Sequence, residues 1–317
     1  MASVYPLQIV FSLALIMSCA AQSLSAQTLT LSFETVIGAQ GNGAGQMIQP
    51  SNVAVDPSGN IYVADTGNSR ILLFDRSGRY LRQIGGFGFG AGQFGRPQGV
   101  AATGLDVFVA DFQNRSVQRF DRVLNHVGTL SGDQAIRPET PIFARPWGLG
   151  ISGLGDIFIT DNDREEVVRM TTSGEVAARF GGFSDGSGRL REPTGIEVGR
   201  DGQVYVADTG NSRIAVYDSF GGFLREIGSG YLSFPRGVSL DGAARVFVAD
   251  TGNSRMVIFS DQGELLLSYG AEGSGIGSFD GPSDIAVFDE KSVLVADTEN
   301  HRIQVFLLSE ISDHLAK

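Results

Sequence analysis

Two side chains that could do chemistry, an aspartate and an arginine, recur along the chain in one fixed pattern. The hexapeptide Asp-Thr-Gly-Asn-Ser-Arg begins at Asp65, Asp208 and Asp250. Weaker copies of it begin at Asp111, Asp161 and Asp297. A catalytic pair is needed once, whereas this one is repeated along the whole chain. We therefore expect a structural role, in which the carboxylate accepts turn N–H groups and the arginine five residues later pairs with it.

Residues suited to nucleophilic or zinc chemistry are scarce. The chain has 3 histidines and 1 cysteine, Cys19. His126, His301 and His314 occupy different parts of the repeating unit, whereas a zinc site needs several ligands around one ion. The sequence also lacks a Gly-x-Ser-x-Gly nucleophile elbow and the ligand spacing of a helix–loop–helix calcium site. These observations predict no catalytic residue.

The repeated aspartates divide the chain into six units of similar length. Successive aspartates are separated by 46, 50, 47, 42 and 47 residues, and a proline precedes each by 14 or 15 residues. An apolar side chain lies three residues before each of these prolines: Met47, Phe94, Phe143, Leu190, Leu232 and Phe279. A regular period of this length is typical of stacked repeats, so we expect these side chains to pack between neighbouring units.

Each unit has the pattern of four short strands. In the first unit we expect strands at 52–56, 60–65, 70–75 and 79–84, separated by Gly, Asp, Asn and Ser turns. The second strand of the unit is continuously apolar, so both of its faces must be covered. Small sheets that pack face to face around an axis provide this cover. The pattern predicts an all-β, six-bladed β-propeller of four-stranded antiparallel blades.

The sixth unit lacks a fourth strand, and the N-terminal region has a matching segment. Residues 31–37, followed by a Gly-rich loop and Pro50, resemble the fourth strand and following loop of the first unit. We expect this N-terminal strand to complete the last blade. Such closure removes the unpaired strand edges that favour aggregation.

The Asp-x-x-Asn-x-Arg core, with its upstream Gly-x-Phe-x-x-Pro loop, resembles the NHL repeat over residues 28–308. The second and third units depart from it, because Ser116 and Glu166 stand where the arginine is expected. The resemblance implies a six-bladed propeller. Similar propellers include ligand-binding ectodomains of bacterial receptor kinases, substrate- or RNA-binding modules of RING-type ubiquitin ligases, a peptide-amidating lyase and lactonases. The fold alone therefore leaves the function open.

One face of the propeller varies most from unit to unit. It is formed by the loops after the fourth and second strands, and the residue after each proline lies at the mouth of the axial channel. The only tryptophan, Trp147, and a cation, Arg236, occupy two of these positions. The candidate ligand-binding residues on this face are Trp147, Arg236, Gln98, Phe112, Asn162, Asp163 and Arg164. An aromatic anchor with arginine is typical of binding hot spots, which favours a non-enzymatic binding or scaffold module for a protein, peptide or glycan.

The innermost strands suggest an alternative function. Their channel-facing positions are mostly small, but Glu197 interrupts them, and Asn52 and Asp284 replace glycines one level higher. These three oxygen-bearing side chains could hold one divalent cation, calcium or zinc, inside the channel. The alternative is then a metal-dependent lactonase- or lyase-like enzyme, whereas the binding module needs no cofactor.

Charge and the N-terminal segment indicate partners and location. The net charge is -11, which disfavours nucleic acid because phosphate binding depends on Lys and Arg. Residues 1–26 are predicted to be a signal peptide, since the apolar stretch 9–17 is shorter than a membrane span of about 20 residues. Cys19 makes a lipoprotein-type anchor an open alternative. We expect residues 27–317 to form an extracytoplasmic propeller that is periplasmic, secreted or lipid-anchored.

Overall fold

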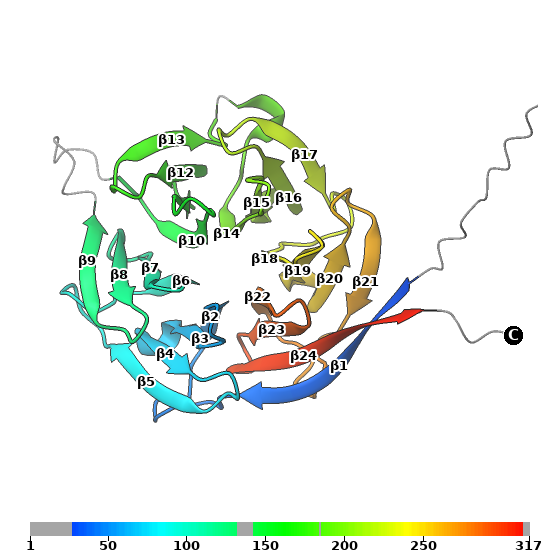
Figure 1. Cartoon of the computed structure of the whole chain (residues 1–317), viewed down its shortest axis with the longest axis horizontal. Helices are drawn as coiled ribbons and strands as arrows, with labels where there is room; N and C mark the ends of the chain where they lie inside the picture. Colours follow the sequence, from blue (N-terminus) through cyan, green and yellow to red (C-terminus); the bar gives the residue numbers. More distant parts are fainter. Residues whose placement is uncertain (1–26, 132–141, 184, 313–317) are drawn as a thin grey trace, which may run out of the picture.

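A computed structural model describes residues 27–131, 142–183 and 185–312. Within these ranges six four-stranded antiparallel sheets are arranged like blades around a central axis (Figure 1). The all-β, six-bladed propeller predicted from the repeat is therefore confirmed. The predicted signal peptide and Cys19 lie outside the described residues. No helix in the described ranges is long and apolar enough to cross a membrane.

Each blade runs from an innermost strand at the axis to an outermost strand at the rim. Blade 1 contains β2 (Pro50–Val55), β3 (Ile61–Asp65), β4 (Arg70–Phe74) and β5 (Tyr80–Gly85). Blade 2 contains β6 (Pro97–Ala102), β7 (Asp106–Asp111), β8 (Ser116–Asp121) and β9 (His126–Ser131). Blade 3 contains β10 (Pro146–Ile151), β11 (Ile157–Asp161), β12 (Glu166–Met170) and β13 (Val176–Phe180).

The second half of the ring repeats this arrangement. Blade 4 contains β14 (Pro193–Val198), β15 (Val204–Asp208), β16 (Arg213–Tyr217) and β17 (Phe223–Ile227). Blade 5 contains β18 (Gly237–Leu240), β19 (Val246–Asp250), β20 (Arg255–Phe259) and β21 (Leu265–Tyr269). Blade 6 contains β22 (Pro282–Phe288), β23 (Ser292–Asp297), β24 (Arg302–Ser312) and β1 (Gln27–Ile37). Short 3₁₀ turns at Thr66–Asn68, Thr209–Asn211 and Thr251–Asn253 follow the second strands of blades 1, 4 and 5, and a fourth, Gly186–Gly188, lies in the loop that enters blade 4.

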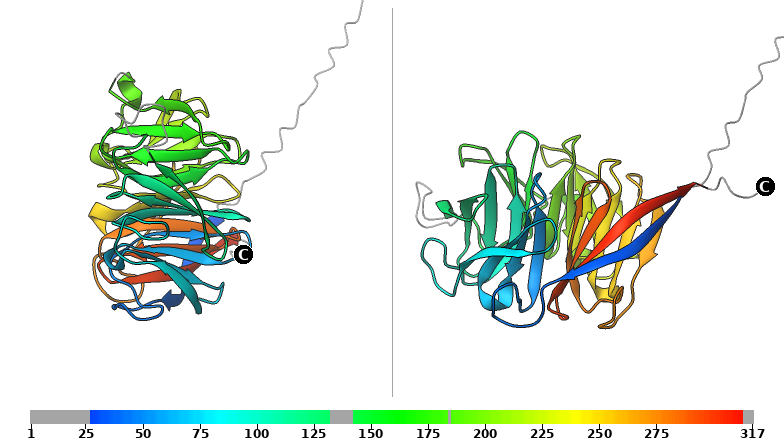
Figure 2. Two further views of the ribbon diagram at one scale, coloured as in Figure 1. Left: turned by 90° about the vertical axis from the view of Figure 1, so that its left-hand side faces the viewer. Right: turned by 60° about the horizontal axis from the view of Figure 1, so that its bottom comes forward.

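The N-terminal strand closes the ring, as the sequence predicts, and is longer than expected. β1 pairs antiparallel with β24 from Gln27 opposite Ser312 to Ile37 opposite Ile303. The outer ends of the two strands form a ribbon that projects beyond the ring of blades (Figures 1 and 2). Leu29 anchors this ribbon, because its side chain is buried in the core between blades 5 and 6.

The hydrophobic core lies between the blades. It consists of six clusters, each joining two neighbouring blades. All five residues of β3, β15 and β19 are buried, which confirms that the second strands are covered on both faces. The apolar side chains three residues before the prolines all belong to these clusters: Met47, Phe94, Phe143, Leu190, Leu232 and Phe279. Their predicted packing role is confirmed.

The recurrent aspartate has the structural role expected from its repetition. Asp65 is fully buried, and its carboxylate accepts bonds from the Ile48 N–H at 2.7 Å and the Asn68 side chain at 2.8 Å. The Arg70 Nε donates to the same carboxylate at 2.7 Å. Asp208, Asp250 and Asp297 are paired with arginine in the same way. The Asp–Arg pair fastens the turn after the second strand to the loop that enters the blade.

Candidate functional site

A common hydrogen bond closes five of the six seams between neighbouring blades in the described residues. A side chain in the turn after the second strand of one blade donates to the carbonyl of the proline at the start of the next blade. The donor–acceptor pairs are Thr66–Pro97, Asn162–Pro193, Thr209–Pro235, Thr251–Pro282 and Thr298–Pro50, at 2.5, 3.1, 2.7, 2.6 and 2.8 Å. Asn162, predicted to contact a ligand, thus takes the place of threonine in one of these bonds.

The seam between blades 2 and 3 is built differently. Its turn carries Phe112, whose ring has no hydrogen-bond donor. The ring packs against Trp147 of blade 3, with centroids 5.3 Å apart and planes at 87°. The guanidinium groups of Arg96 and Arg145 lie over the Phe112 ring, 5.6 and 5.0 Å from its centroid. Both aromatic side chains are half-buried, so part of each remains open to solvent.

Arg236 adds a third cation to this face. Its side chain is exposed, yet partial desolvation by the surrounding protein lowers its pKa, and the nearby Arg96 guanidinium lowers it further. Glu299 and Glu192 act in the opposite direction. Arg96 lies in the loop entering blade 2 and Arg236 in the loop entering blade 5, on opposite sides of the ring.

The other predicted ligand-binding residues contribute less surface. Gln98 is only 3% exposed and lies beneath the face. Arg164 donates from Nη1 to the Ile142 carbonyl at 2.7 Å, which holds the preceding loop in place. The Asp163 carboxylate is exposed and lies 3.9 Å from the Arg145 guanidinium.

Sequence reasoning missed Arg96 and Arg145. Each directly precedes the proline that opens its blade, a position occupied elsewhere by Gln49, Glu192, Phe234 and Gly281. This position varies from blade to blade as much as the residue after the proline does. This variation is visible in the sequence and indicates that the residue before the proline also belongs to the variable face.

The axial channel brings Asn52, Glu197 and Asp284 to one cavity of about 220 Å³. The Asn52 Oδ1 accepts the Val100 N–H at 2.9 Å, and the Asp284 Oδ2 accepts the Val53 N–H at 2.9 Å. Each of these two side chains therefore bridges the innermost strands of neighbouring blades. Within the described ranges no three His, Cys, Asp or Glu side chains are grouped closely enough to hold a metal ion.

Glu197 interrupts the series of small side chains that face the channel. Its Oε1 accepts a long bond of 3.3 Å from the Val198 N–H. Desolvation raises the pKa of Glu197 to about 7. Desolvation also raises the pKa of Asp284 to about 8, with a further contribution from the charge of Glu197. Both carboxyl groups therefore titrate near neutral pH, where ordinary carboxyl groups are fully ionised.

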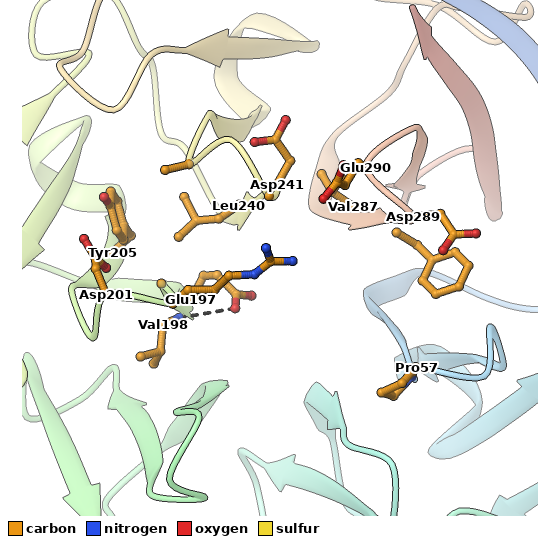
Figure 3. A pocket seen from close by; sticks show the side chains of 15 residues that line it. Pro57, Glu197, Val198, Asp201, Tyr205, Leu240, Asp241, Val287, Asp289 and Glu290 are labelled. Atoms are coloured by element: carbon orange, nitrogen blue, oxygen red, sulfur yellow. Dashed lines mark hydrogen bonds between the residues drawn. The ribbon is translucent and has the colours of Figure 1, made fainter.

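The channel opens on the opposite face into a cavity of about 630 Å³. Figure 3 shows Glu197 at this opening, with the carboxylates of Asp201, Asp241, Asp289 and Glu290 around it. These side chains come from the turns after the first strands of blades 4, 5 and 6. The two mouths thus differ in chemistry: one has aromatic side chains with arginines and acids around them, and the other is mainly acidic, with Arg200 among its carboxylates.

Comparison with known proteins identifies the repeat. The NHL repeat model matches residues 48–74, 190–217 and 279–306, which lie in the regular blades 1, 4 and 6. This chain is an NHL-repeat six-bladed β-propeller. The NHL propeller is 35% identical over 124 residues to the RING finger protein nhl-1 of Caenorhabditis elegans, covering 39% of this chain and 12% of that protein. It is 31% identical over 140 residues to Protein brain tumor of Drosophila melanogaster, covering 43% and 13%.

These curated relatives are much longer than the part that they share with the NHL propeller, which spans about an eighth of their length. Solved structures match nearly all of the propeller at low identity. Virginiamycin B lyase from Staphylococcus aureus superposes with a TM-score of 0.60 at 12% identity, covering 89% of this chain and 99% of that one. An auxiliary nutrient binding protein from Bacteroides thetaiotaomicron gives 0.66 at 13%, covering 89% and 77%. At such identities the likeness shows the fold alone.

Proposed function

We propose that the NHL propeller is an extracytoplasmic, non-enzymatic binding module whose ligand, a protein, peptide or glycan, docks on the Trp147/Arg236 mouth. The observation that carries this proposal is the seam between blades 2 and 3. There the common seam hydrogen bond is replaced by the Phe112–Trp147 pair, flanked by two arginines. A fold that closes its other seams with threonine or asparagine has no packing need for these larger, partly exposed side chains.

The physical chemistry of the mouth supports binding. The Phe112–Trp147 contact holds both rings in place before a ligand arrives, so less side-chain entropy is lost on association. Tryptophan and arginine are the side chains most enriched at the centre of binding sites. Arg96, Arg145 and Arg236 bring three guanidinium groups to the mouth, where Asp163, Glu192 and Glu299 lie among them. These guanidinium groups can pair with carboxylates or other anionic groups of a ligand.

The location follows from the predicted signal peptide at residues 1–26, so the ligand would be met outside the cytoplasm. The acidic balance of the chain argues against nucleic acid as the natural ligand. The structural neighbours include both an auxiliary nutrient binding protein and a lyase, so propellers of this fold occur in binding proteins as well as in enzymes.

The single tryptophan provides a direct test. Residues 27–317 contain only Trp147, so its fluorescence reports on the mouth alone. Peptides or glycans selected on arrays should shift or quench this emission, and Arg236→Ala should weaken their binding at least 10-fold. Phe220→Ala is the matched control, because Phe220 is 82% exposed on a turn of the opposite face. Selected ligands that leave the emission unchanged and tolerate Arg236→Ala would contradict the proposal.

The metal-dependent alternative has weaker support. Asn52 and Asp284 already bridge neighbouring strands, which leaves Glu197 as the one predicted ligand without such a bridge. Metal analysis of the chain purified with and without added calcium or zinc decides between the two functions. One tightly held ion per chain that is lost in Glu197→Gln would favour the enzyme, and lactone hydrolysis would then be the first activity to assay.

A further inference from the structure

Three loops that enter blades share one pattern of backbone hydrogen bonds. They are residues 39–47, 86–94 and 271–279, which precede blades 1, 2 and 6. Each is closed by a parallel bridge: Gln40 with Met47, Phe87 with Phe94, and Glu272 with Phe279. In each, the N–H of the last residue donates to the carbonyl of the first, at 2.8, 3.1 and 2.9 Å. We refer to them as the sister loops.

At the second and fourth positions of the sister loops, only the loop of blade 2 carries aromatic side chains. Phe87 and Phe89 stand where the loop of blade 1 has Gln40 and Asn42, and the loop of blade 6 has Glu272 and Ser274. The two phenyl rings are 67% and 75% exposed and contact each other edge-on at 6.0 Å. The other two sister loops form the same bridge and hydrogen bonds without aromatic residues at these positions. Phe87 and Phe89 are therefore not needed to form the loop, and adjacent exposed aromatic side chains mark an interaction surface.

The loop of blade 2 leads directly to the Trp147 mouth. It connects β5 at the rim to β6 at the axis (Figure 1), and the Asn114 side chain fastens it to blade 2 by donating to the Gly88 carbonyl at 2.9 Å. Arg96 follows this loop and lies over the Phe112 ring. The two phenyl rings therefore lie on the same face as the Phe112–Trp147 pair and its two arginines, and we call these residues together the blade 2 strip: Phe87, Phe89, Arg96, Phe112, Arg145 and Trp147.

We propose that the blade 2 strip binds an extended acidic peptide segment of a partner protein. In this arrangement apolar side chains of the segment contact Phe87 and Phe89 at the rim, and its carboxylates pair with Arg96 and Arg145 near the axis. The proposal rests on the proposed function. It adds the chemical class of the ligand and the direction in which the ligand lies, from the rim to the axis. Charge complementarity supports it, because guanidinium groups bind carboxylates through paired N–H donors.

Arg96 and Arg145 are positioned to pair with the carboxylates of a peptide. Both guanidinium groups rest on Phe112, which fixes their position while their edges stay available to a carboxylate. Arg145 lies 3.9 Å from Asp163, and both side chains are about half exposed. Such an exposed, long ion pair contributes little to stability. A peptide carboxylate can therefore replace Asp163 at little cost.

Two other classes of ligand fit the centre of the strip less well. Guanidinium groups lie over the Phe112 ring, so a sugar cannot stack on that ring. A nucleic acid needs a continuous row of cations along its backbone, but Asp163, Glu192 and Glu299 lie among the arginines of this face.

The test compares the chain with a variant that carries the residues of a sister loop. Phage-displayed 12-residue peptides are selected on residues 27–317, and the enriched peptides are synthesised and titrated by fluorescence anisotropy. We expect acidic peptides with apolar side chains, bound at least 10-fold more weakly by Phe87→Gln/Phe89→Asn and by Trp147→Ala. Unchanged thermal unfolding of the loop variant shows that its fold is intact, as the loop of blade 1 predicts.

Each outcome is informative. If Trp147→Ala weakens binding and the loop variant does not, the ligand occupies the mouth but not the strip, so the proposed function stands and the strip proposal fails. If neither variant has an effect, both fail. If the selection yields no acidic peptides, or if a uronic-acid oligosaccharide or a poly-U oligonucleotide binds more tightly in a Phe87/Phe89-dependent way, the acidic peptide is excluded.

Discussion

Blades 4 and 2 have the same four-stranded backbone but fasten their turns with different chemistry. In blade 4 the Arg213 Nε lies 2.7 Å from the Asp208 carboxylate, and Thr209 closes the seam to the next blade. In blade 2 Ser116 replaces this arginine, and the buried Gln118 binds the entering loop through the Gly92 N–H and the Gln93 carbonyl. The propeller therefore keeps its shape in blade 2 without the arginine, where the Asp111 carboxylate is held by backbone N–H groups. Positions freed from the repeated pattern are available for Phe112 and the surface around it.

The largest loss of stability is expected when the Asp208–Arg213 ion pair of blade 4 is broken. Arg213→Ala removes the guanidinium from Asp208, whose side chain is fully buried. Leaving a buried carboxylate without its cation costs about 3–5 kcal/mol. Gln118→Ala removes two neutral hydrogen bonds and should cost about 1–3 kcal/mol. The free energy of unfolding from urea titrations measures both. Equal losses of unfolding free energy in the two variants would contradict this expectation, because the Gln118 hydrogen bonds would then be as strong as the Arg213 ion pair.

A second effect concerns the channel, where blade 4 itself departs from blade 2. Glu197 stands where blade 2 has Ala101, and desolvation raises its pKa from 4.5 to about 7. The unfolded chain thus releases its proton at a lower pH than the folded chain. The contribution of Glu197 to the free energy of unfolding should fall as pH rises from about 4.5 to about 7 and then level off, whereas that of Asp284 goes on falling to about pH 8. Glu197→Gln should remove this loss, up to about 3 kcal/mol at pH 8.

Urea titrations at pH 5, 6, 7 and 8 measure this effect, and the exposed Glu175→Gln serves as the control. The raised pKa of Asp284, at about 8, leaves a smaller slope in the Glu197→Gln variant. If Glu197→Gln is less stable than the wild type at pH 8, the carboxylate has a stabilising partner, such as a bound cation. That result would move the interpretation toward the metal-dependent alternative.

Most of the fold could be predicted from the sequence because its constraints are local and repeated. The spacing of Asp65 and its copies, the apolar residues before the prolines and the continuously apolar second strands each require a specific place in a blade. The closing strand was predicted because residues 31–37 resemble the fourth strand of the first unit. Its extension to Gln27 was missed, because pairing with the end of β24 depends on how far both strands project from the ring.

The site could be predicted only in part because its contacts cross between blades. Trp147 and Phe112 were named for their residue types, but their contact joins positions 35 residues apart in the sequence. Asn162 and Asn52 were read as ligand contacts, whereas their partners are backbone groups of the next blade. Such partners depend on the twist of the sheets and on side-chain direction, which residue type does not encode. The internal comparison of the sister loops, in contrast, was available from the sequence and pointed to Phe87 and Phe89.

The smallest expected change in stability is at the seam between blades 2 and 3, where one substitution restores the repeated pattern. Phe112→Thr places a hydroxyl where Thr66 and Thr209 donate to the next proline. The new hydrogen bond contributes about 0.5–1.5 kcal/mol, and the lost aromatic contact costs a similar amount. The free energy of unfolding should therefore change by less than about 1 kcal/mol. Ligand binding at the mouth should fall at least 10-fold, because the support for Trp147, Arg96 and Arg145 is removed.

This variant separates stability from binding more cleanly than a truncation to alanine, because it makes the seam resemble its neighbours rather than leaving a gap. The matched change is Thr209→Val at the seam between blades 4 and 5. It removes the bond to the Pro235 carbonyl and should cost about 1–2 kcal/mol without affecting binding. If Phe112→Thr instead destabilises the propeller by several kcal/mol with binding intact, the aromatic pair is a packing solution for that seam. The binding surface must then be sought on another part of the face.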